Sequence, residues 1–189
     1  MAHTAESKEL VDSIQSVTYK INQVSLVPWE EIVIKPLAAA GDYAAEDIMC
    51  ENATTGQPWL FPNMALSPGG WGRIIQAQAF WETTALTPRL TIYLYNKLPT
   101  CELRDNVLNT GPLAADLPFY RGKIDLTALE DLGGMSETII TPSTYGNTPL
   151  LYKCDNSLTY LYGLVVTRDA VTGEAAGAKM HIRLVTERY

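Results

Sequence analysis

The chain has few of the side chains on which most catalytic and metal sites depend. Among its 189 residues there are two histidines and three cysteines. His3 lies in a polar N-terminal stretch, and His181 sits between two cations in a segment that alternates like a strand. We interpret His181 as a solvated strand residue. Because a serine or cysteine nucleophile needs a base such as histidine within hydrogen-bond reach, the sequence favours a protein that is not an enzyme.

The cysteines are odd in number and widely separated, at Cys50, Cys101 and Cys154. A disulfide framework shows an even set of cysteines, and a structural zinc site needs clustered thiolates or histidines. We therefore predict three reduced thiols, and we expect neither a metal nor another cofactor.

Positive charge and long apolar runs are also scarce. The net charge is −7, and no basic stripe is present that would bind phosphate backbones. No stretch approaches eighteen consecutive apolar residues, so no membrane span is expected. The N-terminal sequence MAHTAESKEL lacks the apolar core of a signal peptide, which predicts synthesis and folding in a cytoplasm. We expect neither nucleic acid nor membrane as a partner.

Two patterns that bind ligands in other proteins are incomplete in this chain. The glycine-rich cluster at residues 67–72 precedes a strand-like segment rather than a helix with a lysine, so we interpret it as a tight turn. Asp42, Asp105 and Asp155 carry oxygen atoms that suit calcium, but no calcium-loop pattern surrounds them. We interpret these aspartates as turn-capping residues.

The clearest secondary-structure signal is the strict alternation over residues 90–95. One face carries Leu90, Ile92 and Leu94, and the other carries Thr91, Tyr93 and Tyr95. A period of two predicts a strand, and strict alternation favours an antiparallel sheet. The segment 96–121 that follows is long for a connection in a compact domain, and such loops are commonly functional.

Further short segments with strand character recur at intervals of about ten residues, separated by proline and glycine turns. This spacing, with almost no helical pattern, predicts an all-β, antiparallel β-sandwich with a jelly-roll-like arrangement over residues 31–189. We expect strands at residues 31–36, 47–51, 73–81, 90–95, 122–126, 137–141, 149–154, 158–167 and 179–185, the last two paired as a hairpin.

Alternation within the strands also predicts which side chains form the core. In the strand at 158–167 we choose the face with Tyr160, Tyr162, Leu164 and Val166 as the inward one. The predicted core comprises Leu90, Ile92, Leu94, Ile124, Leu164, Val166, Ile182 and Leu184.

Residues 1–30 form a separate N-terminal segment, which we interpret as an arm. Its apolar residues recur at spacings of three and four, while residues 17–21 also alternate, so a short helix over residues 6–15 followed by extended chain is expected. The segment is too apolar to remain in water. It either adds a strand to its own domain or reaches a neighbouring subunit. The candidate interaction residues are Leu10, Ile14, Val17, Ile21, Val24 and Trp29.

Several short sequences in the remaining chain resemble one family. They are GDYAAEDI at 41–48, GGWGRI at 69–74, PRLTIYLYN at 88–96 with LPT at 98–100 and DN at 105–106, and YRGKI at 120–124. In order and spacing they resemble the auxiliary, decoration or cement proteins of tailed-bacteriophage heads, over about residues 30–189. The resemblance implies a jelly-roll-like domain, often trimeric, that sits on the capsid shell and contacts the major capsid protein. The arm is not part of this pattern.

The sequence therefore predicts a structural virion protein at the capsid surface, made in the host cytoplasm. It would be a homotrimer that binds the major capsid protein and stabilises the phage head. The alternative is a carbohydrate-binding β-sandwich module, in which Tyr93 and Tyr95 on the outward face of their strand stack on sugar rings. A hydrolase assembled from loop carboxylates is a third possibility, but no motif supports it.

Overall fold

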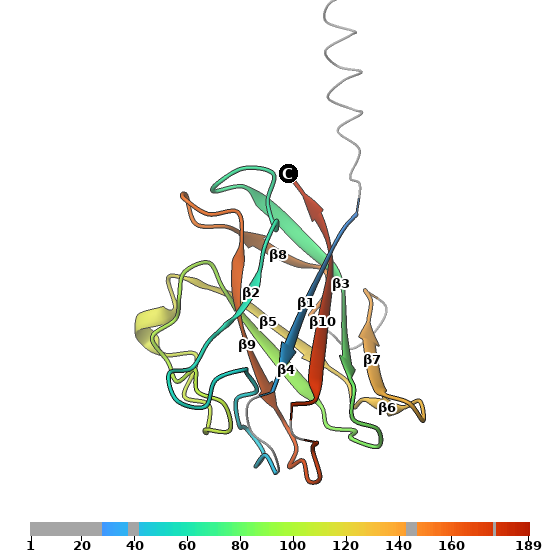
Figure 1. Ribbon diagram of the computed structural model, residues 1–189. Coiled ribbons are helices and arrows are strands. Elements are labelled where there is room, and N and C mark those ends of the chain that lie inside the picture. The colour runs from blue at the N-terminus through green and yellow to red at the C-terminus, as the bar shows by residue number, and fades with distance from the viewer. Residues whose placement is uncertain (1–27, 38–41, 143–146, 176) are drawn as a thin grey trace, which may run out of the picture.

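The computed structural model describes residues 28–37, 42–142, 147–175 and 177–189, and within these residues it is an antiparallel β-sandwich (Figure 1). A six-stranded sheet has the order β1–β10–β3–β7–β6, with β8 also paired to β3, and a four-stranded sheet has the order β2–β9–β4–β5. The strands are β1 (Trp29–Pro36), β2 (Trp59–Phe61), β3 (Trp71–Trp81), β4 (Leu90–Tyr95), β5 (Tyr120–Leu126), β6 (Glu130–Asp131), β7 (Ser136–Ile140), β8 (Leu150–Lys153), β9 (Leu161–Thr167) and β10 (Lys179–Arg188). The predicted fold class is confirmed.

Two of the predicted strand features are wrong. Residues 47–51 form no regular strand, and only Asp47 and Ile48 make isolated bridges, to Leu108 and Val166. The segments at 158–167 and 179–185 do not pair as a hairpin, because β9 lies in the four-stranded sheet and β10 in the six-stranded sheet. The chain between them crosses from one sheet to the other. Alternation shows that a strand has a buried face, but it does not show which strand lies beside it.

The main core fills the space between the two sheets. It contains six of the eight predicted core residues, all of them fully buried, together with large side chains such as Trp59, Trp81 and Tyr152. The six are Leu90, Ile92, Leu94, Ile124, Ile182 and Leu184. Along β10 the alternation that buries Met180, Ile182 and Leu184 is the one expected from the sequence.

The inward face chosen for β9 is wrong. Val165 lies opposite Ile92 of β4 and belongs to the main core, whereas Leu164 lies opposite Tyr93 and points to the other side of the sheet. Leu164 and Val166 are nevertheless buried, in a second and smaller cluster. Because β9 is apolar on both faces, its sequence alone could not indicate which face meets the opposite sheet.

The long segment after β4 covers the outer face of the four-stranded sheet and completes this second cluster. It contains the 3-10 helix η1 (Ala114–Asp116). The buried carboxylate of Asp116 accepts hydrogen bonds from the backbone N–H groups of Thr100 (2.9 Å) and Cys101 (3.2 Å) and from the Thr100 hydroxyl (2.9 Å). These bonds join the two ends of the loop, and its inner side chains pack against Leu164 and Val166 of β9 in the second cluster.

Candidate interaction surface

Strand β1 lies at the edge of the six-stranded sheet. It pairs with β10 along its whole length, from Trp29 opposite Thr186 to Pro36 opposite Lys179. Within the part of the chain that the structure describes, no strand pairs with its other edge. An edge strand presents unpaired backbone N–H and C=O groups, which are a template for pairing with another chain.

The two faces of β1 differ in burial, and the exposed face is the more apolar one. Val33 and Lys35 point inward, and the buried ammonium group of Lys35 lies 2.8 Å from a carboxylate oxygen of Glu51. Ile32 and Ile34 point outward and are 41% and 50% exposed. Isoleucine favours a strand because it is β-branched, but two exposed isoleucines on an edge strand leave apolar surface in water.

The neighbouring strands extend this apolar surface. Ile34 is in register with His181 of β10 and then with Phe80 of β3, while Ile32 is in register with Arg183. Arg183 of β10 lies opposite Gln78 of β3, and Gln78 lies opposite Ile139 of β7. We define the outer patch as Ile32, Ile34, Phe80, Met135 and Ile139.

Polar side chains on this face are paired with one another. The Nε2 atom of His181 lies 3.1 Å from Glu82, and this hydrogen bond lowers the pKa of the Glu82 carboxyl group. Arg183 lies 3.1 Å from a carboxylate oxygen of Glu30, and its guanidinium group lies 5.5 Å from the ring centroid of Phe80. His181 is on the outward face, as predicted, but its partner Glu82 was not identified from the sequence.

A hollow of about 240 Å³ lies beside Phe80, Met135 and His181 on this face.

Within the described residues, no group of three or more histidine, cysteine, aspartate or glutamate side chains is placed to hold a metal ion. The helices of the same residues include none long and apolar enough to cross a membrane.

Of the predicted interaction residues, only Trp29 falls within the structure. It is the first residue of β1, so the sandwich begins two residues before the predicted boundary at residue 31. Its side chain is 37% exposed, its indole N–H donates to Glu31 (3.1 Å), and the Arg188 guanidinium group lies 4.1 Å from its ring centroid. Leu10, Ile14, Val17, Ile21 and Val24 lie outside the described residues.

The sugar-binding surface proposed for Tyr93 and Tyr95 is contradicted. Tyr95 is fully buried, and Tyr93 packs against the second cluster. The ring of Tyr120 lies against both, at centroid distances of 6.4 Å from Tyr93 and 5.4 Å from Tyr95. Alternation predicted the side of the sheet on which these rings lie, but it could not predict that the long loop covers that side.

The three aspartates considered as calcium ligands have structural partners. Asp155 accepts hydrogen bonds from the backbone N–H and hydroxyl of Ser157, at 3.1 and 2.8 Å, which confirms a turn-capping role. Asp42 accepts from the N–H of Gly173 (3.1 Å), and buried Asp105 accepts from the N–H of Cys50 (2.7 Å). Asp42 and Asp105 therefore join segments that are distant in the sequence.

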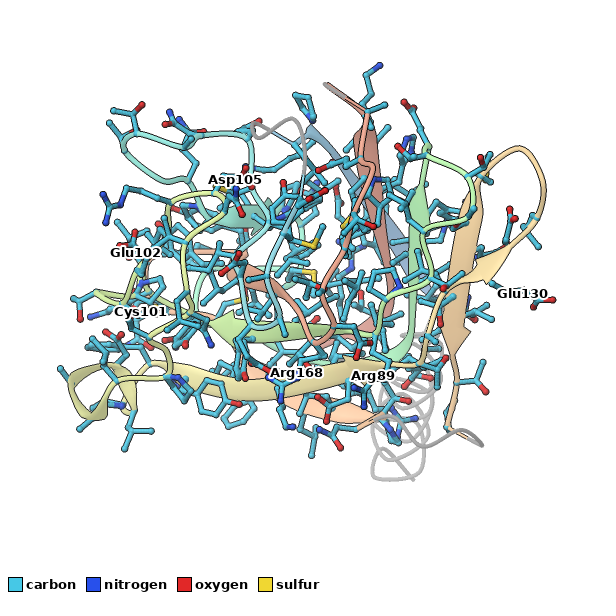
Figure 2. All side chains as sticks on the ribbon, turned by 90° about the horizontal axis from the view of Figure 1, so that it is seen from below. Arg89, Cys101, Glu102, Asp105, Glu130 and Arg168 are labelled. Carbon is cyan, nitrogen blue, oxygen red and sulfur yellow. The ribbon has the colours of Figure 1, made fainter. Side chains whose placement is uncertain are left out.

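All three cysteines are buried, and none is joined to another. Burial raises the pKa of Cys101 and of Cys154 to about 11, and it raises the pKa of Cys50 as well. A thiol with a raised pKa is a poor nucleophile at neutral pH because the thiolate is the reactive form. Figure 2 shows Cys101, Glu102 and Asp105 on one flank of the molecule, far from Glu130 on β6.

No protein-family model and no curated protein matches the chain. Among solved structures, it is similar to a chain from a full particle of Israeli acute paralysis virus heated to 63 degrees, with 12% identity and a TM-score of 0.30. The match covers 84% of this chain and 67% of the viral one. A marine algae virus of the order Picornavirales gives 12% identity and a TM-score of 0.23, covering 84% and 66% of the two chains. The chain thus spans about two thirds of the length of these viral chains.

Proposed function

We propose that the protein is a structural component of a virus particle. It assembles as a homotrimer at the capsid surface, binds the major capsid protein and stabilises the phage head. The observation that carries this proposal is the edge of β1 that no described strand pairs with, which lies beside the outer patch and directly after an apolar N-terminal segment. The resemblance of residues 30–189 to head decoration proteins supports the same role.

The physical argument starts from the cost of leaving this surface in water. Each fully buried isoleucine side chain contributes about 1.5–3 kcal/mol relative to an exposed one, and Ile32 and Ile34 are only partly covered. A neighbouring chain that adds a strand to β1 satisfies the free backbone groups and also covers both isoleucines. Closed cyclic symmetry lets every copy make the same contact, and several weak contacts on one shell raise the avidity.

The test is co-sedimentation with capsids built from the major capsid protein of the encoding virus and lacking this protein. We expect the full-length chain to sediment with them and to form trimers by light scattering. Ile34→Lys places a charge in the contact and should weaken assembly or capsid binding about tenfold or more. Leu117→Lys is the matched control, because Leu117 is similarly exposed (56%) but directly follows η1, in the loop that covers the four-stranded sheet.

Both variants should keep the circular dichroism of the parent chain. If the full-length chain neither forms trimers nor sediments with capsids, the proposal is wrong. If Ile34→Lys and Leu117→Lys bind equally well, the β1 edge is not the contact surface.

A further inference from the structure

Two adjoining hollows lie where β8 of one sheet approaches the start of β5 of the other. Their volumes are about 210 and 270 Å³, and both are lined by Arg121 and Lys153. Lys97 and Phe119 contribute to the smaller hollow, and Trp71 to the larger one. We refer to Trp71, Lys97, Phe119, Arg121 and Lys153 together as the β5–β8 site. It is built on different residues from the outer patch.

The site gathers positive charge in an acidic chain. It contains three cations and one carboxylate, Asp155, which lies 3.4 Å from the ammonium group of Lys97. Within the described residues, neither Arg121 nor Lys153 forms an ion pair, although eight other lysines and arginines do. Because carboxylates outnumber cations in the chain, 21 to 14, unpaired cations at one place point to an anion supplied from outside.

Arg121 shows the clearest unsatisfied group. Its two terminal nitrogens donate to the backbone oxygens of Tyr120 (3.3 Å) and Pro118 (3.0 Å), which fixes the guanidinium plane. Its Nε atom is buried and has no hydrogen-bond partner among the described residues. Burial also lowers the pKa of this guanidinium group. The charge of Asp155 acts against this lowering, but the ion pair of Asp155 is with Lys97. A further anion that pairs with Arg121 would offset the cost of burying its charge.

An aromatic surface lies next to these cations. Trp71 is directly opposite Lys153 in the β3–β8 pairing, so both side chains point outward together. The Lys153 ammonium group lies 5.5 Å from the indole centroid, and the side chain of Trp71 is 54% exposed. Gly72 makes this pairing possible, because a Cβ atom there would lie 2.2 Å from the Tyr152 hydroxyl oxygen. The close approach of β8 to β3 thus sets the ammonium group beside the indole.

We propose that the β5–β8 site binds a carboxylate-bearing sugar, such as a sialic acid or uronic acid residue of a glycan. The exposed indole offers its electron-rich face to the C–H groups of a pyranose ring, and Arg121 and Lys153 pair with the carboxylate through charge-assisted hydrogen bonds. Phosphate sites usually use the N-terminus of a helix or a nest of backbone N–H groups. The described residues around this site contain no α-helix, so a phosphate would have to be held by the arginine and lysine side chains alone.

The test is isothermal titration of the full-length protein with five separate probes. These are N-acetylneuraminic acid, glucuronic acid, glucose, acetate and adenosine monophosphate. We expect at least one of the two acidic sugars to bind, and to bind about tenfold or more tightly than both glucose and acetate. Trp71→Ala and Lys153→Gln should each weaken that binding by about tenfold or more.

Trp29→Ala and Lys179→Gln are the matched controls. Trp29 is an exposed tryptophan beside an arginine, and Lys179 is an exposed lysine without an ion pair among the described residues. Both should bind the sugar like the parent chain. The proposal is overturned if neither acidic sugar binds, if acetate binds as tightly as the sugars, or if the control variants lose as much affinity as Trp71→Ala and Lys153→Gln. Tighter binding of adenosine monophosphate overturns it in favour of a phosphate ligand. None of these results depends on capsid binding.

Discussion

The hydroxyl group of Tyr43 lies 3.1 Å from both carboxylate oxygens of Asp105, in the buried region that joins the long loop to the chain before β2. The two residues are 62 positions apart in the sequence. Burial and the charge of Asp105 raise the pKa of Tyr43, so the hydroxyl stays protonated and donates to the carboxylate. This contact ties the covering loop to the rest of the domain.

We predict that Tyr43→Phe lowers the free energy of unfolding by about 1–3 kcal/mol, because it removes a donor from a buried carboxylate. Urea unfolding at pH 7 measures the change. Tyr189→Phe is the control, since the Tyr189 hydroxyl makes only an exposed contact, 3.3 Å from Glu187. Equal stability of Tyr43→Phe and the parent chain would show that the hydrogen bond contributes nothing.

Glu174 is a second buried acid in this region. Burial, followed by the charge of Asp105, raises its pKa from 4.5 to about 8, and the nearby Tyr43 and Trp81 offset the rise only in part. Below pH 4.5 the carboxyl group is protonated in both the folded and unfolded states. As the pH rises toward 8, the unfolded state loses this proton first, so the free energy of unfolding falls over that window by roughly 3–5 kcal/mol.

We therefore predict that Glu174→Gln is more stable than the parent chain at pH 8.5 and has a flatter stability profile between about pH 5 and 8. Unfolding by urea at a series of pH values provides the measurement. Glu130→Gln is the control, because Glu130 is exposed on β6 (Figure 2). If Glu174→Gln and Glu130→Gln show the same profile, Glu174 does not titrate as a buried acid.

A third prediction concerns the main core. Ile92 is fully buried between the sheets, so Ile92→Ala should lower the free energy of unfolding by about 2–5 kcal/mol. The same substitution at Ile34, on the exposed face of β1, should cost less than about 0.5 kcal/mol in the isolated protomer. Guanidinium unfolding of both variants at low protein concentration gives the comparison. A small effect at Ile92 would mean that the strand register is wrong.

The fold was predictable from the sequence where one face of a strand is polar and the other apolar. In β10, Lys179, His181 and Arg183 alternate with Met180, Ile182 and Leu184, and burial follows that pattern. In β9 the apolar residues occupy both faces, because the strand is covered on one side by the opposite sheet and on the other by the long loop. Alternation therefore cannot show which face of β9 meets the opposite sheet.

The β5–β8 site was not predictable, for a different reason. Trp71 and Lys153 meet only because β3 and β8 pair, and Arg121 joins them because β5 lies beside β8. These positions are separated by tens of residues, and although Trp71 and Arg121 lie in short sequences noted above, nothing in those sequences shows that they meet Lys153. The apolar character of the N-terminal segment, in contrast, is visible in the sequence, and it leads to a prediction about assembly.

Strand β1 starts at Trp29 and already pairs with β10 over its eight residues. Removing residues 1–28 therefore leaves every described strand pair in place. If the removed segment contacts a neighbouring subunit, the truncated chain should keep its circular dichroism and its cooperative unfolding. It should lose trimerisation or capsid affinity by about tenfold or more, which corresponds to about 1.4 kcal/mol.

Light scattering and capsid co-sedimentation measure these two properties, with the full-length chain at equal concentration as the reference. Two results would contradict the prediction in different ways. Unfolding of the truncated chain would show that the segment packs as part of its own sandwich, because loss of an internal strand exposes core side chains. A folded truncated chain with unchanged assembly and unchanged capsid affinity would show that the apolar segment has no assembly role. The contact would then have to lie on the described residues themselves. Ile34→Lys tests the β1 edge directly, and Leu108→Lys tests the covering loop, in which Leu108 is exposed.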